Sequence, residues 1–473
     1  MAPSRPSAAT RRKRFRWAIE GAVWAIVAVL FGRTWLVAGL LLPLEVASGS
    51  MAETLLGPHY RLVCARCGGQ FVCGADHPAA SGVAVCPHCG WKDNALAGQP
   101  VVPGDGVLIV RGAYWLRSPR RWEVVAFRPA DNPRRLAVKR VVGLPGETVR
   151  IFQGDVYING NIARKSLREQ LAVAQLIYSA ADEARMPSGS KSFWRPESPD
   201  SRWVRHRWAY RHGADPESKS LDWLLFQWLQ RGGEGPDGPV ATRAVPVTDA
   251  VAYNQLLPRG GPVPQPVTDL LYTFGLRASG RGRLELRATD GQRLFRFVWE
   301  ITPHGSRCQV FDGQQPLPWP GGAKGLPEGR HLSMAVSLMD RQFLVAVDGE
   351  VLVAHPFDRG EPPACDTPFA IGVQSLEVEV SGLQVYRDVQ YGGIFGGIAH
   401  WGVDRPAILG PGEFFVLGDN SAVSVDSRAW ANPAVRTEQL VGRPLAVLFP
   451  LRLVRFGGLV IQVPAWNRMR YIR

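Results

Sequence analysis

The chain has 473 residues, of which 46% are apolar and 20% are charged, and its formal net charge is +14. At ~150 residues per domain the length predicts about three domains, and the apolar content excludes an intrinsically disordered chain. The positive charge would suit nucleic acid or an anionic membrane surface. Because the arginines are scattered along the chain rather than gathered in one basic block, we expect no nucleic-acid partner.

A basic segment followed by an apolar one opens the chain. Five of the residues from 11 to 16 are Arg or Lys, and residues 18–44 are mostly apolar. This order predicts a basic cytoplasmic tail over 1–16 and a single membrane-spanning helix over 17–44, with membrane lipid as a partner and the rest of the chain outside the cytoplasm. A cleaved signal peptide is the alternative, but a cut after Ala47 would put Glu45 where a small residue is needed.

Five of the seven cysteines lie between residues 64 and 89. Cys64 and Cys67 form one C-x-x-C pair, Cys86 and Cys89 form a second, and each pair is followed by glycine. Two such turns can present four thiolates to a tetrahedral zinc ion with no open position, which is typical of a structural zinc ribbon. Disulfides are the alternative, because the predicted topology puts this segment outside the reducing cytoplasm. We therefore expect a zinc-ribbon-like insertion over 58–103.

Short apolar or alternating runs dominate two further stretches of the chain. Residues 104–160 contain several such runs separated by Gly and Pro, with Asn159-Gly160 at a turn, and residues 413–463 form a second block. Both patterns predict strands joined by tight turns. The two blocks therefore indicate a β-rich parent domain that is interrupted between them.

The region between these blocks divides into two parts. Residues 161–269 are rich in Trp, Arg, Pro and Gly, and we predict helices over 166–185 and 221–230. Residues 270–391 show period-2 runs, one of which leads into an Asp348-Gly349 hairpin turn. This second part predicts an antiparallel β-sandwich whose ligand the sequence does not identify.

Three ordered motifs carry a resemblance to a known family. They are Ser48-Gly49-Ser50-Met51, Lys139-Arg140-Val141-Val142-Gly143-Leu144-Pro145-Gly146-Glu147, and Gly418-Asp419-Asn420 followed by Ser424-x-Asp426-Ser427-Arg428. In this order they closely resemble the bacterial type I signal peptidase (leader peptidase) family, membrane-anchored proteases with a serine-lysine dyad. The resemblance covers residues 18–55, 104–160 and 413 to about 450.

The resemblance implies a role for each matched residue. Ser50 matches the nucleophile and Lys139 the general base, which works only when burial keeps its amine neutral. The Ser50 backbone N–H and the Ser48 hydroxyl would form the oxyanion hole, and Ser424 would orient the lysine amine. Catalysis would need no cofactor. The supporting ion pair would be Asp426 and Arg428.

The sequence therefore predicts a mainly β protein: a signal-peptidase-type catalytic domain behind one transmembrane helix, interrupted by a zinc ribbon and a β-sandwich. The resemblance implies a serine endopeptidase of the bacterial inner membrane that removes signal peptides from exported preproteins on the extracytoplasmic side. The alternative is a catalytically decayed, membrane-tethered scaffold that displays a ligand-binding sandwich. The expected parts of the catalytic domain and its neighbours are 1–16, 17–44, 45–57, 58–103, 104–160, 161–269, 270–391 and 392–473.

Overall fold

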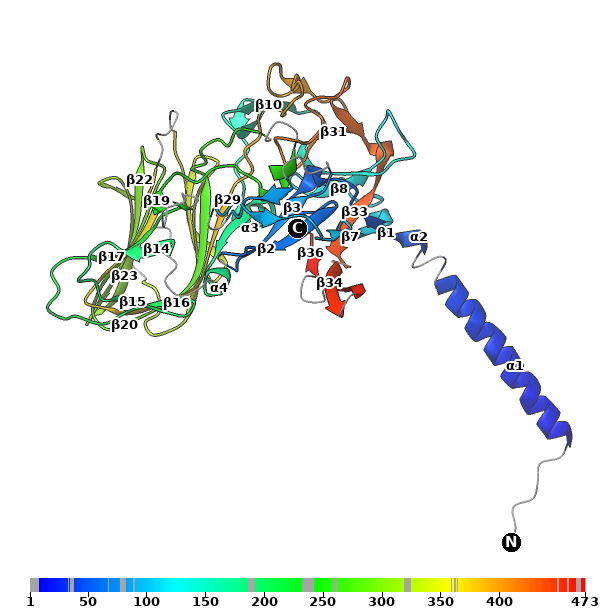
Figure 1. Cartoon of the computed structure of the whole chain (residues 1–473), viewed down its shortest axis with the longest axis horizontal. Coiled ribbons are helices and arrows are strands. Elements are labelled where there is room, and N and C mark those ends of the chain that lie inside the picture. Colours follow the sequence, from blue (N-terminus) through cyan, green and yellow to red (C-terminus); the bar gives the residue numbers. More distant parts are fainter. Residues whose placement is uncertain are drawn as a thin grey trace, which may run out of the picture.

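A computed structural model describes residues 8–472 except 33, 35–37, 67, 77–81, 88–89, 186–191, 232–241, 258–261, 319–324, 359, 361–362, 364, 449–450, 457–458 and 465–468. The described chain is mainly β, as predicted. Three bodies are visible in Figure 1: the helix α1 (Ala8–Phe31), a central group of sheets, and a large two-layered β body on the opposite side. Residues 1–7 of the predicted basic tail lie outside the described residues.

The prediction of a membrane-spanning helix over 17–44 is wrong. Among the described helices, none combines the length and the apolar composition that crossing a membrane requires. The reason is visible in how the apolar segment divides. The helix α1 ends at Phe31, and residues Leu41–Glu45 form the strand β1, which pairs antiparallel with β7 (Gly106–Val110) in the central sheet.

The central sheet brings the three motif segments together. Its strands follow the order β1-β7-β33-β8-β9-β31-β32, with β36 paired to β33. Strands from the first, second and last parts of the chain therefore lie side by side in one sheet. The additional strands are β33 (Leu440–Val447), β8 (Val124–Phe127), β9 (Ala137–Gly143), β31 (Glu413–Leu417), β32 (Ala434–Arg436) and β36 (Arg470–Tyr471).

The middle strands β8, β9 and β31 are buried along most of their length, which explains why they read as continuous apolar runs. Val124 and Ala126 of β8 pack into one core with Met51, whereas Val125 and Phe127 pack into a second core on the other face. A smaller sheet adjoins it, in the order β12-β11-β10-β30. Its strands are β12 (Asn161–Ile162), β11 (Asp155–Ile158), β10 (Thr148–Phe152) and β30 (Ala407–Ile408).

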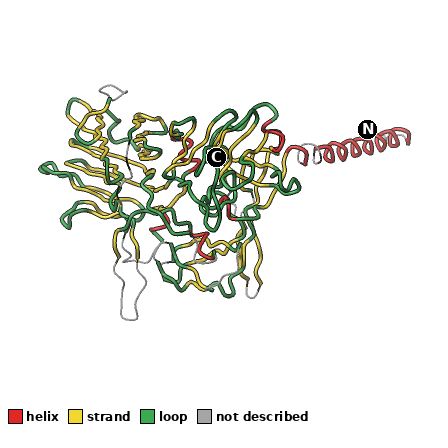
Figure 2. Tube along the Cα trace, turned by 90° about the horizontal axis from the view of Figure 1, so that it is seen from above, coloured by secondary structure: helices red, strands yellow, loops and turns green. Residues whose placement is uncertain are grey.

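The two-layered body is an antiparallel sandwich (Figures 1 and 2), and its two sheets share one large aromatic-rich core. The first sheet runs β15-β16-β29-β20-β25-β26-β27, with β13 paired to β29. Its strands are β15 (Trp203–His206), β16 (Ala209–His212), β29 (Glu377–Arg387), β20 (Leu270–Ser279), β25 (Leu332–Met339), β26 (Gln342–Val347), β27 (Glu350–Pro356) and β13 (Gln175–Ser179).

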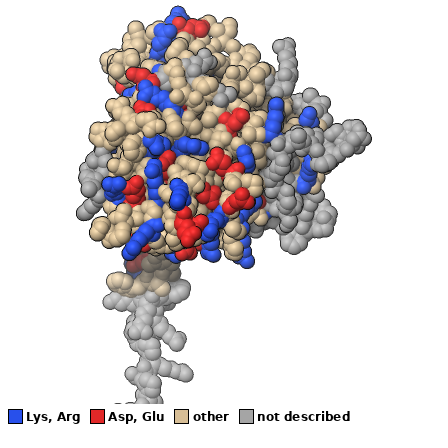
Figure 3. Space-filling model, turned by 90° about the vertical axis from the view of Figure 1, so that its left-hand side faces the viewer, with Lys and Arg blue, Asp and Glu red and all other residues tan. Residues whose placement is uncertain are grey.

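The second sheet of the sandwich runs β14-β17-β28-β21-β22-β23-β24. The Asp348-Gly349 hairpin is confirmed, since both residues have positive φ (50° and 83°) between β26 and β27. At the sandwich end, Figure 3 shows basic and acidic side chains interspersed. The strands are β14 (Trp194–Pro196), β17 (Asp222–Phe226), β28 (Phe369–Gln374), β21 (Gly282–Thr289), β22 (Leu294–Thr302), β23 (Gly305–Asp312) and β24 (Gln315–Leu317).

The cysteine-rich segment forms a small β unit with its own core. Cys64, Cys73 and Cys86 are buried in that core together with Phe71. Its strands are β2 (His59–Val63), β3 (Gln70–Gly74), β6 (Val101–Val102), β4 (Val83–Ala84) and β5 (Asn94–Ala95). The remaining elements are α2 (Ala38–Leu40), α3 (Leu167–Val173), α4 (Ala180–Glu183), η2 (Gly49–Met51), η3 (Arg111–Tyr114), η4 (Ala252–Leu256), η6 (Thr437–Gln439), β18 (Leu229–Arg231), β19 (Thr242–Ala244), β34 (Leu451–Phe456) and β35 (Leu459–Pro464).

Candidate active site

A cleft of about 1120 Å³ lies at one end of the central sheet. It is lined by the end of β1 and the loop through η2 (residues 44–51) and by the approach to β9 (residues 134–139). Tyr253, Asn254, Leu256 and Leu257, in and just after η4, line it as well. The antiparallel pairing of β9 with both β8 and β31 puts the start of β9 beside the loop that follows β31. Ser48, Ser50 and Lys139 all line this cleft.

Lys139 is a buried lysine in apolar surroundings. It lies on the same face of β9 as Ala137 and Val141. Its cross-strand partner on β8 is Val125. Its Nζ donates a hydrogen bond to Ser424 Oγ at 2.9 Å. Burial lowers the pKa of Lys139 to about 8, although the carboxylate of Asp426 opposes this effect. A substantial fraction of this lysine is therefore neutral near pH 8.

Ser48 and Ser50 flank the start of the short helix η2. Ser48 Oγ lies 3.4 Å from Ser50 Oγ, and the Ser50 carbonyl accepts a hydrogen bond from the Asn420 N–H at 3.2 Å. A side chain at Gly418 would overlap both Ser424 Oγ and the Ser50 carbonyl oxygen. The absence of a side chain at position 418 thus lets the segment that contains Ser50 lie close to Ser424. Ser424 in turn contacts Lys139. Of the four predicted catalytic residues, three line the cleft and Ser424 is buried behind it.

Two fully buried ion pairs support this arrangement. Arg428 contacts Asp426 at 2.8 Å, and Asp426 also accepts a hydrogen bond from the Gly418 N–H. Burial disfavours the Asp426 charge, but the Arg428 guanidinium outweighs it and holds the pKa of that carboxyl below its ordinary value. The second pair joins Arg140 to Asp419 at 2.5 Å.

Cys64 and Cys86 each accept the same kind of backbone hydrogen bond, from the glycine four residues later. Gly68 N–H donates to the Cys64 carbonyl and Gly90 N–H donates to the Cys86 carbonyl, each at 2.9 Å. Both glycines have positive φ, 68° and 70°. Two matching turns that carry thiols toward one core fit a tetrahedral thiolate site. The other two predicted zinc ligands, Cys67 and Cys89, lie outside the described residues.

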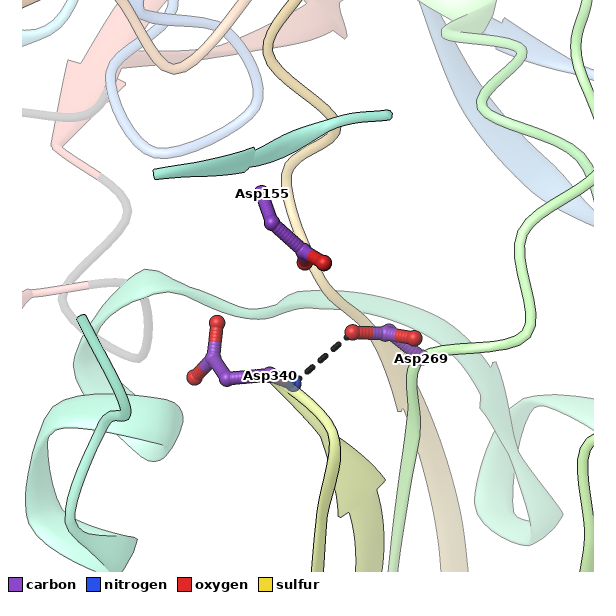
Figure 4. A group of neighbouring side chains, drawn as sticks. All are labelled: Asp155, Asp269 and Asp340. Atoms are coloured by element: carbon purple, nitrogen blue, oxygen red, sulfur yellow. Dashed lines mark hydrogen bonds between the residues drawn. The ribbon is translucent and has the colours of Figure 1, made fainter. Parts of the chain in front are cut away.

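A buried charge network at the base of the sandwich was not foreseen from the sequence. Oxygens of Asp155, Asp269 and Asp340 lie within 4.8 Å of one another, and Asp340 N–H donates to Asp269 (Figure 4). Lys165 Nζ contacts Asp340 at 2.5 Å, and the Arg341 guanidinium lies 3.3 Å from Asp155. Because cationic side chains already pair with two of the three carboxylates, we interpret the cluster as an ion-pair network rather than a metal centre.

Sequence reasoning also missed three residues beside the segment 48–51, which we call the serine loop. Asp76 accepts a hydrogen bond from the Gly49 N–H at 2.8 Å, and Tyr253 and Asn254 of η4 also line the cleft. They lie in the cysteine-rich and linking segments, outside the three motifs. No local pattern in the sequence marks them, because only the fold brings them to the serine loop.

Comparisons with known proteins point to one family for the first part of the chain. Residues 15–204 match the model of "Signal peptidase, peptidase S26". A probable signal peptidase I-2 of Synechocystis sp. is 43% identical over 63 residues, which are 12% of this chain and 29% of that protein. The signal peptidase I of Leptolyngbya laminosa is 38% identical over 63 residues, 12% of this chain and 31% of that protein. The chain thus matches less than a third of the length of these relatives.

Solved structures align with part of this chain at low similarity. The carbohydrate-binding module CBM66 from Bacillus subtilis aligns with 42% of this chain and 97% of its own, at 8% identity and a TM-score of 0.26. A tetrameric galectin from the sponge Cinachyrella sp. aligns with 26% of this chain and 94% of its own, at 16% identity and a TM-score of 0.21.

Proposed function

We propose that this chain, which belongs to the type I signal peptidase family, is a serine endopeptidase that removes N-terminal signal peptides from exported preproteins. The observation that carries the proposal is a buried Lys139 amine, bonded to Ser424 at 2.9 Å and with a pKa near 8, on the same cleft as Ser50. A lysine of this kind can act as a base near neutral pH, whereas an exposed lysine cannot.

In the proposed reaction, the neutral Lys139 amine takes the proton of the Ser50 hydroxyl as Ser50 Oγ attacks the scissile carbonyl carbon. The Ser50 N–H and the Ser48 hydroxyl donate to the oxyanion that forms. Collapse of this intermediate breaks the C–N bond, and the leaving amine takes the proton from Lys139. A water molecule, deprotonated by the same amine, then hydrolyses the Ser50 ester. Ser424 keeps the lysine amine oriented throughout.

The substrate is proposed to lie extended between residues 44–48 and residues 134–138, where two backbone segments border the cleft. Small side chains beside the scissile bond are expected, as the family resemblance implies.

We propose that cleavage occurs on the extracytoplasmic side of the bacterial inner membrane. Contact with anionic membrane lipid is part of this proposal, since residues 11–16 are strongly basic, and flotation of the purified chain with vesicles measures it.

Replacing the nucleophile tests the proposal most directly. The purified chain should cleave a preprotein between its signal peptide and its mature part, and Ser50→Ala should lose this cleavage because no hydroxyl remains to form the ester. Product masses by mass spectrometry identify the bond that is cut. If wild type and Ser50→Ala cleave equally, the activity comes from a contaminating peptidase. If neither cleaves, the decayed-scaffold alternative is favoured.

The buried lysine also predicts how activity depends on pH. Because Lys139 must be neutral to take a proton, kcat/KM should rise with pH through an apparent pKa of about 8 and level off above it. Initial rates on a fluorogenic signal-peptide substrate between about pH 6 and pH 10 measure this profile. A rate that is flat over this range, or that falls as the pH rises, would contradict a lysine base.

We also propose that Cys64, Cys67, Cys86 and Cys89 hold a structural zinc ion, which would cross-link the small β unit around Cys73 and Phe71. The matching turns at Cys64 and Cys86 support this. Metal analysis should find about one equivalent of zinc, and Cys86→Ser should lose it and destabilise the unit. Cys308→Ser, in the sandwich, is the control that should keep the metal. Disulfides among the four cysteines would refute the zinc site.

A further inference from the structure

Both peptide groups of Gly49, the residue between Ser48 and Ser50, are held by side chains from distant parts of the chain. The Gly49 N–H donates to Asp76 Oδ2 at 2.8 Å. The Gly49 carbonyl accepts a hydrogen bond from Asn420 Nδ2 at 2.9 Å. The serine loop is thus fixed from two sides, one provided by the cysteine-rich unit and the other by the loop after β31.

Each of these two contacts is in turn held by a residue of η4. Tyr253 donates its hydroxyl to Asp76 Oδ1 at 3.0 Å. Asn254 and Asn420 exchange two amide hydrogen bonds, of 2.8 and 2.7 Å, and both side chains are buried. Two consecutive residues of η4 therefore control the two supports of Gly49. We call Asp76, Tyr253, Asn254 and Asn420 the Gly49 clamp.

The packing around Gly49 agrees with this arrangement. A side chain at Gly49 would overlap the aromatic ring of Tyr253, and one at Gly74 would overlap the same ring. Tyr253 is buried, and its single hydroxyl proton is shared between Asp76 Oδ1 and the Pro58 carbonyl, whose oxygen lies 2.8 Å from the hydroxyl oxygen. The ring therefore fills the space that the two glycines leave open, and this packing fixes the position of η4 relative to the serine loop.

Peptide geometry connects the clamp to catalysis. The Gly49 carbonyl and the Ser50 N–H belong to one planar trans peptide group and point in opposite directions. A hydrogen bond that fixes the direction of the carbonyl therefore also fixes the direction of the Ser50 N–H. A bond to the carbonyl also polarises the group and strengthens the N–H as a donor.

We infer that Asn254 and Tyr253 are positioning residues, which aim the Ser50 N–H at the oxyanion through Asn420 and Asp76. This inference rests on the proposed function, in which that N–H is an oxyanion donor. It makes η4, which belongs to the linking region and lies outside the three motifs, a working part of the peptidase. The Asn254 amide contributes most, because its loss leaves the buried Asn420 amide without its partner.

Kinetics on the full chain test the inference. We expect Asn254→Ala to lower kcat roughly tenfold while KM changes by less than about twofold, because a misaimed oxyanion donor weakens transition-state binding only. Tyr253→Phe keeps the ring but removes the hydroxyl, and it should lower kcat about threefold. In an Asn420→Ala background, Asn254→Ala should have little further effect, since the two act as a unit. Asn254→Asp, which keeps the side-chain shape but removes the donor, replaces Asn254→Ala if that variant fails to fold.

Gln255→Ala is the matched control, since Gln255 is on η4 but accepts a hydrogen bond from the Val85 N–H, away from Gly49. It should keep wild-type kcat. Hydrogen-deuterium exchange of the peptide that covers Gly49 to Met51 should be several-fold faster in Asn254→Ala than in Gln255→Ala. Equal exchange in a folded Asn254→Ala variant would overturn the inference. So would a loss of kcat in Gln255→Ala that matches the loss in Asn254→Ala. An inactive wild type would refute the proposed function instead, and the exchange comparison would still decide the clamp.

Discussion

Replacement of Lys139 by arginine is expected to abolish signal-peptide cleavage. A guanidinium stays protonated at any workable pH, so the variant keeps a positive charge beside Ser424 but has no lone pair to accept the Ser50 proton. We expect the rate to fall by at least ~10³-fold, because a serine hydroxyl without its base is a poor nucleophile. Single-turnover cleavage of a preprotein, read by the release of the mature chain, measures the loss.

Lys139→Met is the matched control for folding, since it keeps the length of the side chain without any charge in a site that is already apolar. It should be as inactive as Lys139→Arg and at least as stable to thermal unfolding. The double variant Ser50→Ala/Lys139→Met should be no less active than either single variant, because the two residues act as one unit. Substantial cleavage by Lys139→Arg would mean that another group is the base, and the scaffold alternative would gain support.

Features that depend on neighbouring residues could be predicted from the sequence. The Asp348-Gly349 turn was predictable because only a few residue types adopt positive φ at both positions of a tight hairpin. The mainly β character followed from period-2 runs such as the one before that turn. The motifs could be recognised because each is a short run of neighbouring residues, and in the structure Ser50 and Lys139 line one cleft.

Predictions failed where the local composition was compatible with either a helix or a strand. The apolar segment over 17–44 predicted one helix, yet its last part is β1, because pairing with β7 satisfies its backbone groups in the sheet. The predicted helix over 221–230 was wrong for the same reason. Residues Asp222–Phe226 form β17, which pairs with both β14 and β28, so tertiary pairing outweighed local propensity.

Long-range contacts could not be predicted at all. The contact between Asn254 and Asn420 joins residues 166 positions apart, and the contact between Gly49 and Asp76 spans 27. A single asparagine or aspartate in a loop is ordinarily a surface or turn residue, so nothing local distinguishes these from others. The clamp exists only because the fold packs η4 and the cysteine-rich unit against the serine loop.

The second large effect is expected at the junction of the sandwich and the smaller sheet. Lys165 Nζ contacts Asp340 at 2.5 Å and Asp388 at 2.8 Å, and all three side chains are almost fully buried. Lys165→Met removes the cation but keeps the apolar stem, so two carboxylates remain buried without compensation. We expect the free energy of unfolding at pH 8 to fall by about 3–5 kcal/mol, the range measured when one partner of a buried ion pair is removed.

The loss of stability in Lys165→Met should be smaller at low pH than at high pH. Burial raises the pKa of Asp388 to about 6 and also raises that of Asp340, even though Lys165 opposes both shifts. An acid whose folded pKa exceeds its unfolded value near ~3.9 binds more protons when folded, so its contribution to stability is largest at low pH and is lost as the pH rises through the folded pKa. Without Lys165 both values should rise further. The variant should therefore recover much of its stability between about pH 8 and pH 5.

Urea unfolding at the two pH values, followed by tryptophan fluorescence, measures this difference. Arg211→Met is the control, because it breaks an exposed ion pair with Glu379 on the sandwich and should cost less than about 1 kcal/mol at either pH. The triple variant Lys165→Met/Asp340→Asn/Asp388→Asn should regain stability at pH 8, since the two carboxylates that Lys165 pairs with are then removed together with it. A Lys165→Met variant that is as stable as wild type at pH 8 would show that the two carboxylates reach solvent. The network would then have no role in holding the sandwich to the smaller sheet.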